Sequence, residues 1–121
     1  MYRTRRLPSG SWNWGARASR PSRTFLYEFG RPSPVQELGA CHALEFGFVF
    51  DTLNIPESHA LTGPDAPQDL AITMHHAWVS FAATGDPGWT QWNAERPVML
   101  FDADGQRVVR APREAERRLW R

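Results

Sequence analysis

Leu38-Gly39-Ala40-Cys41-His42-Ala43-Leu44-Glu45-Phe46-Gly47-Phe48-Val49-Phe50 is the stretch of this chain that says most about its fold. A histidine follows Gly39 and Ala40 and precedes a dense apolar block that holds a single carboxylate, Glu45. An apolar block this short cannot be assigned to a helix or a strand by periodicity alone. We expect a short helix over residues 43–50, with His42 in the loop before it.

Composition indicates an ordinary soluble domain. The 121 residues are enough for one domain with a modest core, and 41% hydrophobic with 22% charged residues is typical of globular proteins. A net charge of +1 gives the whole molecule no strong attraction for nucleic acid or membranes. No apolar run approaches the roughly 18 residues of a membrane span, so no membrane partner is expected. Cys41 is the single cysteine, which excludes an intrachain disulfide.

Residues 1–23 form an irregular, arginine-rich arm that differs from the rest. The arm holds six arginines and no acidic residue, and it shows no helical or strand period. Three interpretations stay open: nucleic-acid contact through the arginines and through stacking of Trp12 and Trp14, a targeting peptide, or a non-native stretch from a wrong start codon or a frameshift. No apolar run follows Arg5-Arg6, so no secretory signal is indicated and a cytoplasmic location is expected.

The first half of the chain after the arm predicts one strand and two loops. Residues 24–29, Thr-Phe-Leu-Tyr-Glu-Phe, are β-branched and aromatic and are followed by Gly30 and Pro32, which predicts a buried strand. The prolines of residues 31–37 indicate a loop. The polar residues 54–63 are also expected to form a loop.

The clearest element is a helix over about residues 66–84. Asp65 and Gln68 have the spacing of a capping box, and Pro67 suits a first turn. Gly85 suits the C-terminal cap, and Pro87 prevents the helix from continuing. One apolar stripe with helical spacing runs along it, formed by Leu70, Met74, Ala77, Trp78 and Phe81.

The last third predicts a hairpin and a terminal helix. Residues 98–101 and 107–109 have the composition of short strands, and Asp102-Ala103-Asp104-Gly105 between them is a turn signal. The same four residues resemble the start of a calcium loop, but the later ligands are missing, so a turn is expected. A helix is expected from Pro112 to about Trp120.

Other polar residues give no metal or nucleophile site. His75 and His76 are adjacent, so on a helix they point about 100° apart, and we expect a solvated helix face rather than a metal site. Cys41 next to His42 suggests a nucleophile pair, but adjacent residues rarely bring their side chains together. We expect Cys41 to be a packing residue, and we expect no metal and no cofactor.

Five blocks of the chain, in order, resemble the C-terminal part of the type-B carboxylesterases, the family of the cholinesterases and para-nitrobenzyl esterases. They are the aromatic strand 25–29, the proline turn 32–34, the histidine motif 39–50, the helix end Ala-Trp-x-x-Phe-Ala-x-Thr-Gly-Asp-Pro at 77–87, and the closing segment 92–113. The resemblance covers residues 24–121. It implies an α/β fold that is a C-terminal fragment of an α/β-hydrolase: a late sheet strand, a histidine loop, a long helix, a small hairpin and a terminal helix.

The resemblance also assigns roles to residues. It makes His42 the catalytic base of a serine, acid and histidine triad. It gives Glu45 and Gly39 structural roles behind His42, since the triad acid of the family lies far upstream. The sequence has no G-x-S-x-G nucleophile elbow and no H-G-G-G-type oxyanion loop, and Ser9-Gly10-Ser11 is the nearest failed match.

Two functions of different classes follow. The first is a carboxylic-ester hydrolase that keeps only its histidine and is inactive alone, with an ester substrate only in an intact enzyme and a complementary upstream esterase chain as partner. The second is a non-catalytic interaction module, with nucleic-acid binding through residues 1–23 as its less favoured form. Because the resemblance stops near residue 23, a non-native origin of the arm is favoured. We expect marginal stability for the chain without a partner.

Overall fold

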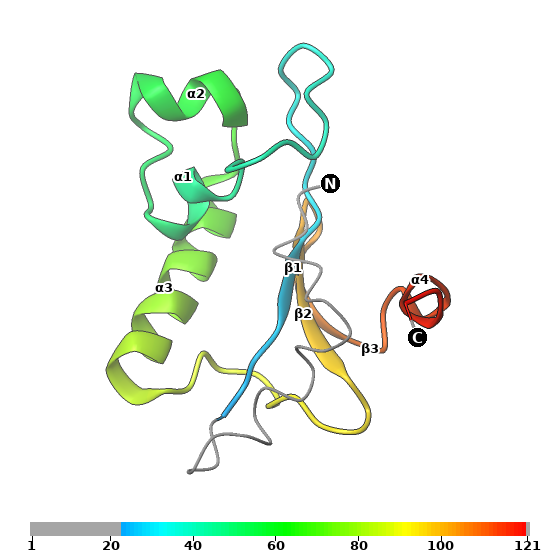
Figure 1. Cartoon of the computed structure of the whole chain (residues 1–121). Coiled ribbons are helices and arrows are strands. Elements are labelled where there is room, and N and C mark those ends of the chain that lie inside the picture. The colour runs from blue at the N-terminus through cyan, green and yellow to red at the C-terminus, as the bar shows by residue number, and fades with distance from the viewer. Residues whose placement is uncertain (1–22, 121) are drawn as a thin grey trace.

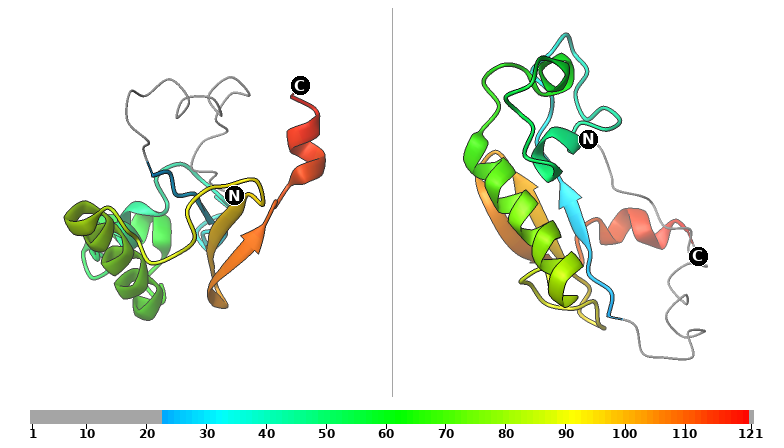
Figure 2. Two further views of the ribbon diagram at one scale, coloured as in Figure 1. Left: turned by 90° about the horizontal axis from the view of Figure 1, so that it is seen from below. Right: turned by 90° about the vertical axis from the view of Figure 1, so that its left-hand side faces the viewer.

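The computed structural model describes residues 23–120, so the predicted arm, except Arg23, lies outside the described residues. The helices α1 to α3 lie on one side of a small sheet, and α4 lies on the other (Figure 1, Figure 2). The described elements, in chain order, are β1 (Tyr27–Phe29), α1 (Phe46–Val49), α2 (Pro56–Thr62), α3 (Gln68–Thr84), β2 (Pro97–Asp102), β3 (Gly105–Arg110) and α4 (Glu114–Arg118).

The sheet has the order β1-β2-β3 and mixes both strand directions. β1 pairs in parallel with β2, with Tyr27 opposite Met99 and Phe29 opposite Phe101. A parallel pair needs a long crossover, and α1 to α3 supply it. β2 and β3 form an antiparallel hairpin in which Asp102 lies opposite Gly105. The α/β architecture and the hairpin predicted from the sequence are therefore confirmed.

The predicted loop at residues 54–63 is wrong, because most of it is the helix α2. Pro56 lies in the first turn of α2 and Glu57 adds an acidic side chain there, which are both helix-start signals. The segment is short, polar and without an apolar stripe, so hydrophobic periodicity gives no sign of this helix. Tertiary contacts hold its other end, where Ser33 donates a hydrogen bond to the carbonyl of Leu61.

The predicted capping box of α3 is also wrong. Pro67 is the N-cap and makes no side-chain cap, and the Gln68 side chain instead donates to the carboxylate of Asp51. The other end agrees with the prediction, since Gly85 has φ +74° and its N–H bonds to the carbonyl of Phe81. Only glycine adopts this left-handed conformation without strain.

The apolar stripe of α3 is only partly buried. Leu70, Met74 and Ala77 lie in the core, as predicted, whereas the rings of Trp78 and Phe81 remain nearly half exposed. They make edge-to-face contacts with Tyr27 and Phe25, at centroid distances of 6.1 and 6.0 Å. The sheet is too narrow to cover the C-terminal half of the stripe.

Three predicted elements are real but shorter than expected. The first strand covers Tyr27–Phe29 rather than residues 24–29, and the helix after His42 is only Phe46–Val49. The terminal helix is Glu114–Arg118. Residues before β1 nevertheless stay bonded to the last third of the chain, since the carbonyls of Thr24 and Leu26 accept from Trp92 and Met99.

The core lies between the sheet and α1 and α3. Phe29 from β1 and Phe48 from α1 are fully buried, with ring centroids 5.0 Å apart. Leu44, Ala71, Met74 and Phe101 are the other fully buried apolar residues of this core. Arg31 places its guanidinium over the Phe48 ring at 5.7 Å. The helix that follows His42 is therefore anchored through Phe48 to the first strand.

Ion pairs attach α4 to the opposite face of the sheet. Arg113 binds the carboxylate of Glu28 with two nitrogens, Nη2 at 2.6 Å and Nε at 2.9 Å, and so joins α4 to β1. The carboxylate of Glu114 forms ion pairs with Nη2 of Arg117 at 2.7 Å and with Nη2 of Arg96 at 3.1 Å. α4 has no buried residue, so these charge pairs replace apolar packing.

Replacing the buried ring of Phe48 tests the core. We expect Phe48→Ala to lower the free energy of unfolding by about 3–5 kcal/mol, because a buried aromatic ring leaves a cavity that its neighbours cannot close. Phe50, two residues further on, is 65% exposed, and Phe50→Ala should change the free energy of unfolding by about 0.5 kcal/mol at most. Urea unfolding followed by circular dichroism measures both, and equal losses would contradict this description of the core.

The charge pairs of α4 should fail in acid. Hydrogen bonding from Arg117 is the main cause that lowers the pKa of Glu114 to about 2, from an ordinary 4.5. A depressed carboxyl pKa means that the pairs stabilise α4 fully above about pH 4.5 and lose this effect as pH falls toward 2. The Nε–H signals of Arg117 in nuclear magnetic resonance spectra should report this loss.

Two variants control the acid experiment. Glu114→Gln should already show a loosened Arg117 at neutral pH, with no further step in acid. Glu95, exposed and 3.5 Å from Arg110, gives a matched loss of charge in a different ion pair. Glu95→Gln should leave the Arg117 signals at their wild-type positions, and an acid step in Glu114→Gln would show that another group holds α4.

Candidate functional site

The loop that leads to His42 begins beyond the carboxyl end of β1, and hydrogen bonds between its own backbone groups hold its two arms together. The N–H of Ser33 donates to the carbonyl of Gly39 at 2.8 Å, and that of Leu38 donates to Val35 at 2.9 Å. Gly39 has φ +54°, a left-handed conformation that favours glycine. The predicted site residue Gly39 thus ends a tight loop three residues before His42.

His42 begins a turn that leads directly into α1. The turn residue Ala43 has φ +63°, which is unusual for a residue with a side chain, and its carbonyl accepts from the N–H of Phe46 at 3.1 Å. The carbonyl of Glu45 accepts from Phe48 at 3.0 Å and from Val49 at 2.9 Å. The turn faces solvent on one side, since His42 is exposed while Leu44 and Glu45 are buried.

Glu45 is a buried carboxylate, only 4% exposed, on an otherwise apolar helix start. Its Oε2 has no hydrogen-bond donor among residues 23–120. Burial raises the pKa of Glu45, while its own backbone N–H and the nearby charge of His42 lower it. His42 and Glu45 therefore interact electrostatically, which agrees with their placement in one motif.

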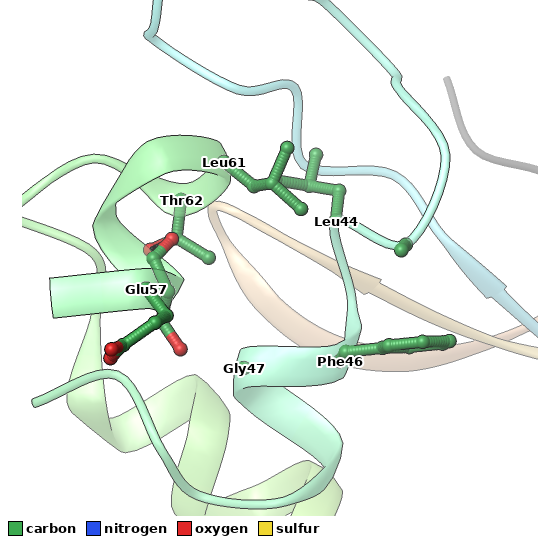
Figure 3. Close-up of a pocket in the computed structure, with 8 residues that line it drawn as sticks. Leu44, Phe46, Gly47, Glu57, Leu61 and Thr62 are labelled. Carbon is green, nitrogen blue, oxygen red and sulfur yellow. Dashed lines mark hydrogen bonds between the residues drawn. The ribbon is translucent and has the colours of Figure 1, made fainter. Parts of the chain in front are cut away.

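A shallow hollow of about 150 Å³ lies beside this turn. Figure 3 shows its two walls, one from the segment after His42 and one from α2. The walls include Leu44, Phe46 and Gly47 on the first side and Glu57, Leu61 and Thr62 on the second. Gly47 lets the walls approach, because an added Cβ would lie 3.3 Å from Ser58 Oγ and 3.3 Å from Thr62 Cγ2, both in α2. His42 does not line the hollow, so a ligand there would not meet its ring.

Two contacts of the segment after His42 were not predicted from the sequence. His75 was expected on a solvated helix face together with His76, but it is half buried and its Nδ1 lies 2.9 Å from the carbonyl oxygen of Val49. His76 is exposed, as predicted. His59 Nε2 makes an equivalent contact of 2.9 Å with the carbonyl of Leu53. No local pattern identifies such pairs, because the partners are backbone atoms 6 and 26 residues away.

Within the described residues, neither a metal site nor a membrane-spanning helix accompanies the histidine turn. Residues 23–120 contain no group of three His, Cys, Asp or Glu side chains placed to hold a metal ion. None of the helices in that range is long and apolar enough to cross a bilayer. The Asp102 carboxylate accepts from the N–H of Asp104 and from Arg107, so this segment is the predicted turn.

Comparison with known proteins gives consistent relatives. Phenmedipham hydrolase of Pseudarthrobacter oxydans is 30% identical over 101 residues, which are 75% of this chain and 20% of that protein. The carboxylesterase EST55 of Geobacillus stearothermophilus superposes with a TM-score of 0.67 and 34% identity, over 82% of this chain and 22% of its own. A thermophilic PNB esterase superposes with a TM-score of 0.68 at 24% identity, which supports the fold alone, over 79% and 21%. No family model matches the sequence.

The lengths of these relatives matter for the site. The chain spans about a fifth of the length of the relatives that it matches. About four fifths of each relative therefore has no counterpart in residues 1–121. Whatever those parts contribute to a site in the relatives has to come from elsewhere if the site is to be complete here.

Removing the charge of Glu45 tests its environment. Because burial raises its pKa above the ordinary 4.5, the folded chain holds the Glu45 proton more tightly than the unfolded chain. The associated stability is present below about pH 4.5 and is lost as pH rises through the folded pKa. We therefore expect Glu45→Gln to gain stability relative to the wild type between about pH 4 and pH 7, measured by urea unfolding. Glu57→Gln removes a charge from an exposed position of α2 and is the control for the loss of a carboxylate as such.

Proposed function

Because this chain is a relative of the type-B carboxylesterases and corresponds to their C-terminal part, we propose that it supplies the histidine base of a carboxylic-ester hydrolase. In this proposal the chain is a C-terminal fragment of an α/β-hydrolase fold, with β1 as a late strand of the larger sheet. His42 is the catalytic base, and the remaining catalytic groups lie outside residues 1–121, on the upstream esterase part that is proposed as its partner. The observation that carries the proposal is the position of His42 relative to the parallel strands.

In α/β folds, active sites lie beyond the carboxyl ends of the parallel strands. β1 and β2 are such a pair, and the loop that leaves the carboxyl end of β1 carries His42. His42 is exposed on this loop, while its neighbours Leu44 and Glu45 are buried. A general base must come within hydrogen-bond reach of the proton that it takes, and the exposed His42 can be reached by a serine that lies outside the described residues.

The reaction would follow the serine-esterase sequence. The imidazole of His42 would take the proton of a serine hydroxyl as the serine oxygen attacks the ester carbonyl carbon, and would then pass that proton to the leaving alkoxide. The acyl group would remain on the serine until water, activated by the same imidazole, releases the acid. This chain has no nucleophile elbow and no oxyanion loop in its sequence, so His42 by itself provides a proton acceptor and nothing to attack the ester.

Glu45 and Gly39 would support His42 without touching substrate. The buried carboxylate of Glu45 interacts with the charge of His42, so it would stabilise the imidazolium that forms when the serine proton is taken. Gly39 would set the path of the loop through its left-handed backbone. Neither residue is proposed as the triad acid, which would lie outside residues 1–121.

Exposed aromatic side chains beside the histidine turn support a second chain. Phe46 and Phe50 make an edge-to-face pair at 6.4 Å, and both rings are more than half exposed. At the other end of the helical layer, Trp78 and Phe81 are also only partly covered. Large apolar groups gathered near a site commonly mark contact surfaces. The proposed partner is the upstream four fifths of an esterase of this family.

Activity measurements test this function directly. The isolated chain is expected to hydrolyse p-nitrophenyl acetate no faster than its His42→Ala variant, because imidazole without a positioned serine gives only weak background catalysis. The Geobacillus carboxylesterase can be truncated before the region that matches this chain. Mixing this chain with that truncated protein should produce hydrolysis of the ester, and the hydrolysis should disappear in His42→Ala. His76→Ala, an exposed histidine of α3, is the matched control and should retain it. Robust hydrolysis by the isolated chain would overturn the proposal.

A further inference from the structure

A histidine of α3 is bonded to the short helix that follows His42. His75 Nδ1 lies 2.9 Å from the carbonyl oxygen of Val49, the last residue of α1. A carbonyl oxygen only accepts hydrogen bonds, so the Nδ1 of His75 carries the hydrogen and donates it. Carbonyls at the end of a helix lack partners within that helix, so the imidazole satisfies a group that would otherwise need water.

Backbone hydrogen bonds continue from this contact to the histidine turn. The N–H of Val49 donates to the carbonyl of Glu45 at 2.9 Å, and the N–H of Phe46 donates to the carbonyl of Ala43 at 3.1 Å. Ala43 directly follows His42. The imidazole of His75 is therefore connected with the backbone of His42 through two backbone hydrogen bonds and two peptide bonds, Glu45–Phe46 and His42–Ala43.

The short helix depends on such external contacts. α1 has four residues, and a single helical turn is unstable by itself because its formation fixes several backbone dihedrals for one hydrogen bond. Phe48 anchors α1 to the sheet through its ring, and Gly47 and Val49 are buried beside it, but these apolar contacts are not directional. His75 adds a directional bond at the end of α1, and His59 adds another at Leu53, beyond the helix.

We propose that His75 is a positioning residue for His42: its Nδ1–H bond to Val49 sets the orientation of α1 and thereby the direction of the His42 imidazole. This inference rests on the proposed function, in which His42 is the catalytic base. It assigns to a residue of the long helix, 33 positions away in the chain, a part in aligning that base. A triad base must be aligned to well under 1 Å, so a small rotation of α1 would reduce turnover.

Three variants separate this role from simple packing. His75→Asn keeps a side-chain N–H in about the place of Nδ1, because the asparagine amide nitrogen is the same number of bonds from Cα. His75→Leu keeps apolar volume and removes the donor. His76→Asn makes the same chemical change one residue away, on an exposed position of α3.

The first measurement uses the full chain and no substrate. In nitrogen-15 spectra of the histidines, His75 should be the Nδ1–H tautomer, and the His42 ring signals should shift in His75→Leu and return in His75→Asn. The Val49 N–H bonds to Glu45, so its exchange reports how firmly α1 is held. It should rise about three- to tenfold in His75→Leu, because loss of the bond to the Val49 carbonyl loosens α1, and stay near the wild-type rate in His75→Asn and His76→Asn. If His75→Leu does not fold, the tautomer and the His75→Asn spectrum still decide the outcome.

The second measurement uses the chain mixed with the upstream esterase part. His75→Leu should lower kcat with little change in KM, because the base is misaligned while the substrate surface is intact, and His75→Asn should restore kcat. An Nε2–H tautomer, unchanged His42 signals in His75→Leu, or no rescue by His75→Asn would each overturn the role of His75. A failure of the proposed function is distinguishable, since it abolishes His42-dependent hydrolysis but leaves the spectroscopic coupling intact.

Discussion

The structure depends first on the contact between Phe29 and Phe48. These two rings join the first strand to the helix that follows His42, and both are fully excluded from water. Burial of large aromatic rings is the strongest stabilising contact available to a chain this small. The crossover between β1 and β2 closes around this pair, so the loop with His42 is held against the sheet.

Polar contacts then fix the orientation of the elements, which the apolar core alone leaves undetermined. His75 and His59 bond the carbonyls of Val49 and Leu53, so two helices of the crossover hold the segment after His42. On the opposite face of the sheet, Arg113 reaches Glu28 and holds a helix that buries no apolar side chain. Hydrogen bonds are directional while apolar contacts are not, so the core gathers the elements and the polar groups orient them.

Sequence patterns predicted the elements whose signals are local. The stripe and the terminal Gly85 identified α3, and Asp102-Ala103-Asp104-Gly105 identified the hairpin. The helix α2 was missed because its start signals, Pro56 and Glu57, stand in a polar segment that owes its helix partly to distant contacts such as Ser33 with Leu61. The capping box failed because Gln68 had a better partner in Asp51. Propensity is a weak guide where tertiary contacts compete with it.

The sequence by itself determined the α/β class, the relationship to carboxylesterases and the choice of His42 as the candidate base, because these rest on residue types in a linear order. Tertiary structure alone decided that Glu45 is buried beside His42, that Trp78 and Phe81 stay half exposed, and that His75 faces Val49 rather than solvent. The reason is physical: burial and hydrogen-bond partners depend on which distant segments meet. Linear spacing carries no information about a backbone carbonyl 26 residues away.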